Sequence, residues 1–280
     1  MRGMYLPLQS TRVTGVDLAF RSMGTTGSDV LFVHGWVSSG RMWHSAMRTL
    51  SRYHRTFAPD LPGFGDSQAI PLIQYKIDFW VDLLAEFIQQ QGLKAPMLVG
   101  HSMGGMISIK LALRYPELVS RIVCINPVVT GRTHLDLRLI AESPLSAVMR
   151  KFGHWVWPFV SSGAMADPLG LVRTANGDYV RNQEDWGKVN GEMTIAGLRA
   201  IMRCDLSPQL PQLTQPTLVV IGRYDLTAPN SEGRLLAEKA PNAELVVLRA
   251  GHLPTDDLPS LIEAMLLGYA EGQNLFPQKR

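Results

Sequence analysis

The chain alternates between short apolar runs and longer amphipathic segments. Runs rich in β-branched residues and bounded by turn residues predict buried strands; they lie at 29–33, 54–59, 95–99 and 121–126, from 217, and at 244–248. Residues 8–23 alternate more loosely around Gly15, which predicts an antiparallel hairpin at one edge of a sheet. Strands that alternate with helices indicate an α/β fold, with a mostly parallel central sheet flanked by helices on both faces.

The segment 75–91 shows the clearest helical pattern. Its apolar residues recur three, four, seven and eleven positions after the first, while charged and amide side chains occupy the opposite side. Gly92 follows at the position where a glycine commonly ends a helix. Further helices are expected near 41–52, from about 106 to Pro116, near 231–240 and near 258–270.

The alternation stops over residues 129–213, where several helix-like patches but no convincing pair of strands occur. Long insertions into loops cost little chain entropy, whereas a structureless loop of this length is rare in a compact domain. We therefore predict a core formed by residues 1–128 and 214–280, with residues 129–213 inserted as a helical cap over the strand ends. The insertion contains aromatic candidates for lining an apolar substrate pocket, namely Trp155, Trp157 and Phe159.

Residues 98–105 combine the end of an apolar strand, the motif Gly-x-Ser-x-Gly and the start of a helix. A serine acts as a nucleophile only where its oxygen is exposed and a base can reach it, and a sharp strand-to-helix turn provides that exposure. Gly100 and Gly104 keep Cβ atoms out of the crowded turn. The turn also places Ser102 at a helix N-terminus, whose free N–H groups favour a developing negative charge. Ser102 is therefore the candidate nucleophile.

Two further candidates follow the last two predicted strands. Asp225 lies just past the strand that begins at 217, and His252 lies just past the strand at 244–248. Sites in parallel α/β sheets collect at the carboxyl ends of the strands, so we expect Ser102, Asp225 and His252 to meet at one edge. Their order along the chain is that of the α/β-hydrolases.

In these motifs the chain resembles the α/β-hydrolases with a cap domain. Residues 29–36, an apolar strand followed by His-Gly-Trp, resemble the oxyanion loop of that family, and residues 57–67 resemble the loop after the next strand. Carried over by position, the resemblance implies that Ser102 is the nucleophile, His252 the base and Asp225 the acid. It also implies an oxyanion hole formed by the backbone N–H groups of Trp36 and Met103.

A serine at this turn narrows the chemistry that the resemblance implies. In this fold an aspartate there suits dehalogenases and epoxide hydrolases, whereas a serine suits acyl transfer. We predict a serine hydrolase that cleaves a carboxylic ester through an acyl-enzyme, favours apolar acyl groups and needs no cofactor or metal. C–C bond hydrolases, thioesterases, lactonases and perhydrolases use the same triad. A ligand-binding receptor of the same fold, with little turnover, is an alternative of another class.

One of these alternatives fits the sequence less well than the others. C–C bond hydrolases of this family usually carry Gly-Pro-Gly after the oxyanion loop and a tryptophan after the catalytic histidine. This chain has Val37–Gly40 and Leu253 at those places. Thioester, lactone and ester cleavage are not separated by any residue of the chain.

Other polar residues near the motifs have less specific explanations. His34 belongs to the His-Gly turn and is expected to shape the loop, while His101 flanks the nucleophile and is expected to point away from the cleft. The aspartates at 256–257 lie too close in sequence to His252 to be preferred as its acid. Some relatives place the acid after the preceding strand, but that position holds Asn126.

Composition limits the remaining possibilities. Hydrophobic residues form 46% and charged residues 18% of the 280 residues, and the formal net charge is +3. These values describe a globular protein with a large core and lack the clustered basic footprint of a nucleic-acid binder. Residues 1–10 hold no apolar run suited to a signal peptide, and no stretch of ~18 apolar residues marks a membrane span. We expect a cytoplasmic enzyme whose partner is a small-molecule acyl substrate.

The two cysteines add little chemistry. Cys124 lies in a predicted core strand, where a thiol behaves as a small apolar group. Neither Cys124 nor Cys204 has metal-ligand spacing to a histidine. The sequence therefore predicts neither a disulfide framework nor a metal site.

Overall fold

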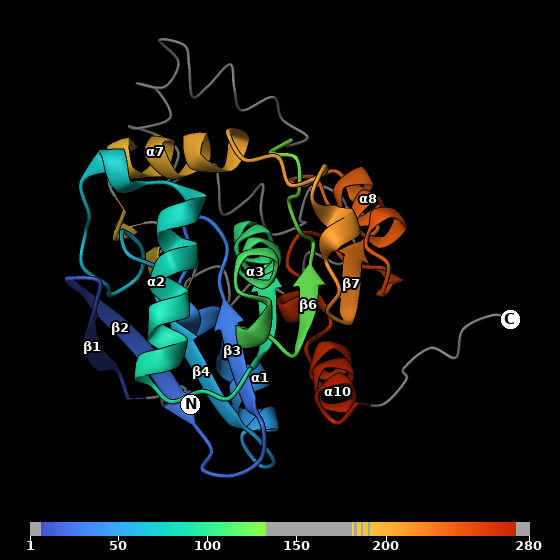
Figure 1. Ribbon diagram of the computed structural model, residues 1–280, viewed down its shortest axis with the longest axis horizontal. Helices are drawn as coiled ribbons and strands as arrows, with labels where there is room; N and C mark the ends of the chain where they lie inside the picture. Colours follow the sequence, from blue (N-terminus) through green and yellow to red (C-terminus); the bar gives the residue numbers. More distant parts are fainter. Residues whose placement is uncertain (1–6, 133–180, 182–183, 186, 190, 273–280) are drawn as a thin grey trace, which may run out of the picture.

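The computed structural model describes residues 7–132, 181, 184–185, 187–189 and 191–272. An eight-stranded sheet forms the centre of this part of the chain, in the order β1-β2-β4-β3-β5-β6-β7-β8 (Figure 1). The strands are β1 (Gln9–Val13), β2 (Val16–Met23), β3 (Asp29–Val33), β4 (Arg55–Pro59), β5 (Met97–His101), β6 (Arg121–Ile125), β7 (Thr217–Gly222) and β8 (Ala243–Leu248). β2 is antiparallel to β1 and β4, and the other neighbours are parallel. The predicted α/β class is confirmed.

The N-terminal hairpin takes the predicted edge position in the sheet. Its turn lies at Thr14 and Gly15, whose φ angles of 50° and 77° both fall in the left-handed region that a two-residue hairpin turn favours. Thr14 Oγ1 donates to Glu86 Oε2 at 2.8 Å and the Thr14 N–H donates to Glu86 Oε1 at 3.3 Å. The turn is thereby tied to the helix that carries Glu86.

Helices cover both faces of the sheet (Figure 1). The helices of the described residues are α1 (His44–Leu50), α2 (Ile77–Gln90), α3 (Met103–Arg114), α7 (Gly191–Met202), α8 (Asn230–Lys239), α9 (Pro254–Asp257) and α10 (Pro259–Ala270). The helices α2, α3 and α8 contribute to one core cluster, and α1 and α10 contribute to the other. Successive strand residues point to opposite faces, so Leu31 lies in the first cluster and Phe32 in the second.

Most helix boundaries agree with the periodicity. The strongest amphipathic pattern is α2, and Gly92 adopts a φ of 61° just beyond its end. The segment expected as one helix near 41–52 instead divides into a 3-10 turn at Gly40–Trp43 and α1. The C-terminal helix begins at Pro259 after the short α9, because proline needs no N–H partner in the first helical turn.

The helix α7 is the longest described piece of the insertion at 129–213. In Figure 1 it runs along the top of the view, above α2. Residues 133–180 lie outside the described residues, so the prediction of a complete cap remains untested. The candidate pocket residues Trp155, Trp157 and Phe159 lie outside the described residues as well.

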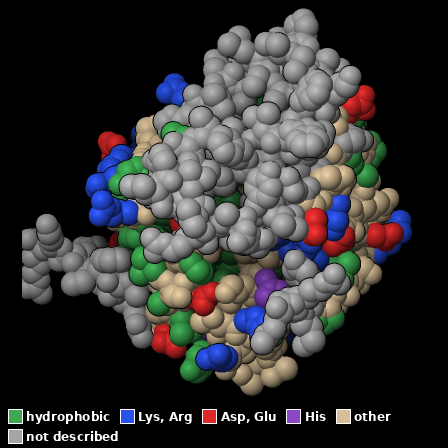
Figure 2. Space-filling view, turned by 180° about the vertical axis from the view of Figure 1, so that it is seen from behind, with side chains coloured by type: hydrophobic (Ala, Val, Ile, Leu, Met, Phe, Trp, Pro, Cys, Tyr) green, Lys and Arg blue, Asp and Glu red, His purple; other side chains and the backbone are tan. Residues whose placement is uncertain are grey.

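Two surface properties bear on the predicted partners. Among the described residues, no helix is both long enough and apolar enough to cross a membrane. On the face seen in Figure 2, the described acidic and basic side chains are interspersed rather than gathered by sign. These two observations do not test the predicted cytoplasmic location. They also do not test the prediction that the protein binds no nucleic acid.

Candidate active site

Ser102 occupies the turn between β5 and α3, with φ 53° and ψ −115°. This conformation is rare for a residue with a side chain and costs on the order of 1–3 kcal/mol, so the surroundings must enforce it. The Ser102 N–H donates to Ile125 O of the neighbouring strand at 3.0 Å. A Cβ atom at Gly100 would lie 2.4 Å from Gly104 O, and one at Gly104 would lie 2.2 Å from Val33 O. Glycine is therefore required at both positions, as the motif predicts.

His252 and Asp225 form a buried hydrogen-bonded pair. His252 Nδ1 donates to Asp225 Oδ2 at 2.7 Å, and the two residues are 5% and 4% exposed. Because Nδ1 carries the proton that it donates in this hydrogen bond, a neutral ring has a lone pair on Nε2. The pair therefore has the tautomer that a general base needs.

The Asp225 carboxylate is held by its own loop as well as by the histidine. Asp225 Oδ1 accepts from the N–H groups of Thr227 at 2.7 Å and Ala228 at 3.0 Å. Burial alone would raise the pKa of Asp225, but His252 and these two N–H donors outweigh it and hold the pKa below its ordinary value. Asp225 is thus a fixed, ionised partner for the imidazole.

Strand order brings the three predicted residues to one edge. Ser102 follows β5, Asp225 follows β7 and His252 follows β8, and these strands run parallel with β6 between β5 and β7. The ring of His101, the residue before Ser102, lies 4.7 Å from the ring of His252 between centroids. His252 and Ser102 therefore belong to neighbouring parts of one buried site.

The loop after β3 packs directly against the nucleophile. A Cβ atom at Gly35 would stand 3.3 Å from Ser102 Cβ and 2.9 Å from His101 Nδ1, so this residue must be a glycine. Trp36, the predicted oxyanion donor, follows Gly35 in the same loop. Met103, the other predicted donor, is the first residue of α3, where N–H groups have no partner within the helix.

His34 shapes this loop, as the sequence predicts. His34 Nδ1 lies 2.7 Å from Gly35 O, and His34 Nε2 accepts from the Leu61 N–H at 2.8 Å. Burial lowers the pKa of His34, which keeps the ring neutral. The ring thereby joins the loop after β3 to the loop after β4 and has no free nitrogen for proton transfer.

The side chain of Trp36 anchors the insertion. Trp36 Nε1 donates to Thr194 O of α7 at 3.0 Å. A Cβ atom at Gly197 would lie 3.0 Å from Trp36 Cδ1 and 3.1 Å from Phe64 Cζ. Gly197 therefore allows α7 to approach the loop that carries the predicted oxyanion donor. No periodicity in the sequence indicates this contact.

Buried ion pairs connect the insertion to both loops beside the site. Arg41 pairs with Asp185, whose Oδ2 also accepts from Ser39 Oγ at 2.8 Å. Arg181 Nη2 pairs with Asp256 Oδ2 at 2.7 Å, four residues after His252 in the chain. Neither pair could be predicted from the sequence, because the charged residues of the insertion follow no regular pattern.

Asp60, in the loop after β4, binds groups from three parts of the chain. It is fully buried, and its Oδ1 accepts from Arg21 Nη1 at 3.0 Å and from the Gly40 N–H at 2.7 Å. Its Oδ2 accepts from the Asp66 N–H at 2.8 Å. Asp60 thus fixes the loops after β3 and β4 relative to each other.

The alternative acids have other partners. Asp257 Oδ2 accepts from the Gly251 N–H at 2.6 Å, and Asp256 pairs with Arg181. Asn126 bonds main-chain groups rather than the ring of His252. Cys124 is fully buried, and burial raises the pKa of its thiol, which suits the predicted core role.

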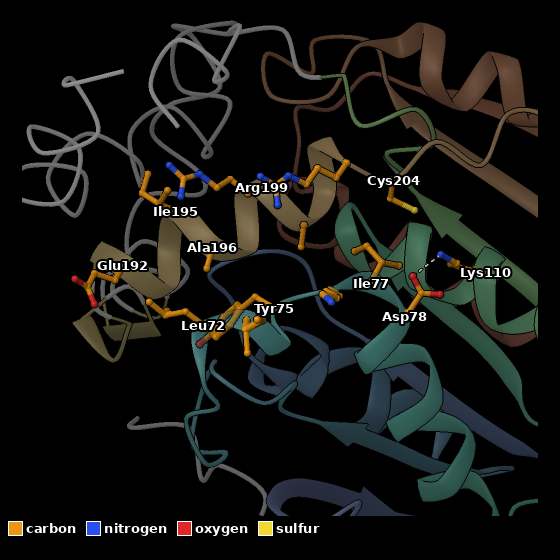
Figure 3. A pocket seen from close by; sticks show the side chains of 14 residues that line it. Leu72, Tyr75, Ile77, Asp78, Lys110, Glu192, Ile195, Ala196, Arg199 and Cys204 are labelled. Atoms are coloured by element: carbon orange, nitrogen blue, oxygen red, sulfur yellow. Dashed lines mark hydrogen bonds and ion pairs between the residues drawn. The ribbon is translucent and has the colours of Figure 1, made fainter. Parts of the chain in front are cut away.

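A separate groove of about 560 Å³ lies between α7 and the segment 72–78 (Figure 3). Its apolar wall includes Ile77 and Ile195, and Lys110 pairs with Asp78 at 2.8 Å within it. The lining residues include no member of the predicted triad. The groove is therefore distinct from the strand-end site described above.

Comparison with known proteins agrees with this geometry. The family model described as alpha/beta hydrolase fold matches residues 30–159, which include the loop after β3, the serine turn and the start of the insertion. The chain has the α/β-hydrolase fold. The resemblance that its motifs show is confirmed, because the match covers the loop after β3 and the serine turn, and the sheet is mostly parallel as expected.

Individual relatives extend the likeness of this α/β-hydrolase over most of its length. It is 27% identical over 237 residues to the pimeloyl-(acyl-carrier protein) methyl ester esterase of Aeromonas hydrophila, with 81% of this chain and 89% of that protein covered. A solved hydrolase from Pseudomonas aeruginosa has a TM-score of 0.83 at 23% identity, covering 96% and 99% of the two chains. A thermophilic esterase from Thermogutta terrifontis has a TM-score of 0.75 at 25% identity, covering 95% and 98%.

Proposed function

We propose that this α/β-hydrolase cleaves carboxylic esters, with Ser102 as nucleophile, His252 as general base and Asp225 as the acid of the triad. The observation that carries the proposal is the 2.7 Å hydrogen bond from His252 Nδ1 to Asp225 Oδ2. It lies at the same sheet edge as a serine held in a strained turn. Relatives named as esterases support the ester as the bond that is cleaved.

The reaction proceeds in two acyl-transfer steps. Ser102 Oγ attacks the carbonyl carbon of the ester while His252 Nε2 takes the hydroxyl proton. The tetrahedral intermediate collapses when His252 returns this proton to the departing alcohol, which leaves an acyl-enzyme. Water then attacks the acyl-enzyme with His252 again as base, and the carboxylic acid leaves as Ser102 regains its proton.

Two backbone donors stabilise the oxyanion in this proposal. The N–H of Met103 lies at the start of α3 and that of Trp36 lies in the loop packed against Ser102. Such donors act on the charge that develops in the transition state, and each is worth ~10²–10³ in kcat. The hydrogen bonds of His34 and Asp60 hold the loops around Trp36, so these donors are pre-positioned.

The insertion at 129–213 forms the acyl side of the site in this proposal. The described part, α7, already lies against Trp36 and Phe64. Apolar side chains of the insertion, including Trp155, Trp157 and Phe159, complete a pocket for apolar acyl groups. Thioesters and lactones present the same carbonyl to the same residues, so a substrate panel that includes them separates these activities.

Serine-directed labelling combined with turnover tests the proposal. A fluorophosphonate probe is expected to label the parent and Ser207→Ala, a serine outside the site, but not Ser102→Ala. Turnover of p-nitrophenyl esters should follow the same pattern, with thermal melting showing that all three proteins fold. Full labelling of Ser102→Ala would assign the reactive serine elsewhere. Labelling without turnover of any ester, thioester or lactone would favour a ligand-binding receptor.

A further inference from the structure

The main-chain carbonyl of His252 accepts two side-chain hydrogen bonds. His101 Nε2 lies 2.8 Å from His252 O, and Asn126 Nδ2 lies 2.9 Å from the same oxygen. A carbonyl oxygen has two lone pairs, so both are used. His101, Asn126 and His252 are 3%, 2% and 5% exposed, so no bulk solvent competes for these bonds.

Asn126 joins the acid loop to the base loop through one amide. Its Oδ1 accepts from the Gly222 N–H at 2.7 Å at the end of β7, just before the Asp225 loop. Its Nδ2 also donates to Gly251 O at 2.9 Å. A donor on one side and two carbonyl acceptors on the other leave only one amide orientation. The residue itself has a φ of 43°, a conformation that asparagine tolerates better than most residues.

His101 is held as a neutral donor. Its Nε2 must carry the proton because its partner is a carbonyl oxygen. Burial lowers the pKa of His101 to about 3; His252 and His34 also act to lower it, while the bond to His252 O and the charge of Asp225 oppose the shift. Its Nδ1 faces Gly35 of the oxyanion loop. His101 therefore lies between the oxyanion loop and the base without competing for the proton of Ser102.

We propose that His101 and Asn126 are positioning residues of the ester hydrolysis, which fix the main chain of His252 and thereby the ring that Asp225 orients. The inference rests on the proposed function, because it assigns His252 as the base. Neither side chain touches the reacting atoms. We call the two donors on His252 O the carbonyl clamp.

The carbonyl clamp predicts an effect on catalysis that a purely structural role of the two side chains does not. A fixed imidazole needs both its main chain and its Nδ1–H bond to be held, since a shift of about 1 Å at reacting groups can cost ~10²-fold in rate. Removing a donor should therefore lower kcat more than KM, and a side chain that restores the donor should restore kcat. Loss of a buried hydrogen bond elsewhere should lower only thermal stability.

Four variants separate these outcomes. His101→Leu removes a donor, and His101→Gln places an amide nitrogen where Nε2 stood. Asn126→Ala removes the other donor. Thr56→Val is the matched control, because it removes a buried side-chain bond, Thr56 Oγ1 to Met23 O at 3.1 Å, from a different part of the sheet.

The expected result is a fall in kcat of about 10- to 100-fold for His101→Leu and for Asn126→Ala, the scale of one lost buried donor, with KM changed less than about twofold. His101→Gln should recover to within about threefold of the parent, and Thr56→Val should keep the parent kcat. The clamp is refuted if His101→Gln is no more active than His101→Leu, or if Thr56→Val loses kcat equally. If His101→Leu does not fold, the kcat values of Asn126→Ala and Thr56→Val are compared instead, and equal values refute the clamp.

A second readout separates the clamp from the proposed function. A parent that cleaves no ester and takes no fluorophosphonate refutes the proposed function alone. The clamp is then read from the downfield proton NMR signal of the His252 Nδ1–H, assigned by its loss in Asp225→Ala. The signal should persist in His101→Gln and broaden by exchange in His101→Leu. An unchanged signal in His101→Leu would overturn the clamp.

Discussion

Gly35 and Ser102 lie so close that a Cβ atom on Gly35 would stand 3.3 Å from Ser102 Cβ. The oxyanion loop and the nucleophile turn are therefore in van der Waals contact through glycine. Trp36, which we propose as an oxyanion donor, is the next residue of this loop.

Trp36→Pro should cost more than Trp36→Ala. Proline lacks the N–H that we propose as an oxyanion donor, and one such donor is worth ~10²–10³ in kcat. Alanine keeps the N–H but loses the bond from Trp36 Nε1 to Thr194 O. Steady-state kinetics of both variants on one p-nitrophenyl ester provides the measurement. Equal kcat values would place the second donor at another residue, with Val37 the first to examine.

Asp225→Asn should lower kcat by ~10⁴ without unfolding the protein, because the amide cannot hold the imidazole in the tautomer that a base needs. Asp257→Asn is the matched control, since Asp257 is also a carboxylate near His252 in the chain and its Oδ2 accepts from the Gly251 N–H. It should lose far less activity. Losses of similar size in the two variants would contradict the assignment of Asp225 as the acid.

The sequence predicts Ser102, Asp225 and His252 as a triad because each residue follows a strand with a clear apolar pattern. The β-branched runs before Ser102, Asp225 and His252 each fixed a strand end, and parallel order placed those ends together. It did not predict that the ring of His101 would donate to the His252 carbonyl. Such a contact depends on side-chain direction at the turn, which periodicity does not specify.

The loops around the site were less predictable for a related reason. Asp60 looks like a turn residue in the sequence, yet it binds Arg21 and the Gly40 N–H, which are distant in the chain. Contacts of this kind follow from tertiary packing, and no local pattern encodes them. The same holds for Gly197, whose role depends on two aromatic rings from the core.

His101→Gln should remove part of the pH dependence of stability. Burial lowers the pKa of His101 to about 3, whereas an unfolded histidine titrates near ~6.5. Between these values the unfolded chain binds a proton that the folded chain does not, so the free energy of unfolding decreases as pH falls, by about 1.4 kcal/mol per pH unit.

Denaturant titrations of the parent and His101→Gln at pH 7 and pH 5 check this prediction. The other histidines are common to both proteins, so their effects cancel in the difference. At pH 5 the variant should have gained about 2 kcal/mol relative to the parent, compared with pH 7. Parallel stability curves would show that His101 is protonated in the folded protein.

Gly197→Ala should reduce activity by about 3- to 30-fold, because the added Cβ would stand 3.0 Å from Trp36 Cδ1 and displace either α7 or the oxyanion loop. Gly187→Ala is the control, since a Cβ there meets no atom within 4 Å. Turnover of a short ester and thermal melting should be measured for both. An unchanged rate in Gly197→Ala would show that the loop does not depend on its contact with α7.

Acyl-chain preference tests the apolar pocket. Each methylene moved from water into such a pocket is worth ~0.8 kcal/mol, so kcat/KM should rise about fourfold per methylene up to a limit set by pocket length. Trp155→Ala or Trp157→Ala should shift that limit while leaving fluorophosphonate labelling intact. A flat series from acetate to octanoate in the parent and both variants would assign substrate choice to the core loops.

The ion pairs Arg41–Asp185 and Arg181–Asp256 have a consequence for exchanging parts between homologues. Each pair has one partner in the insertion and one in the core beside the site. A chimaera that receives a foreign insertion without residues equivalent to Asp185 and Arg181 would lose both pairs, and removing one partner of a buried ion pair is strongly destabilising. Functional grafting of this segment therefore requires the four residues to be transferred as a set.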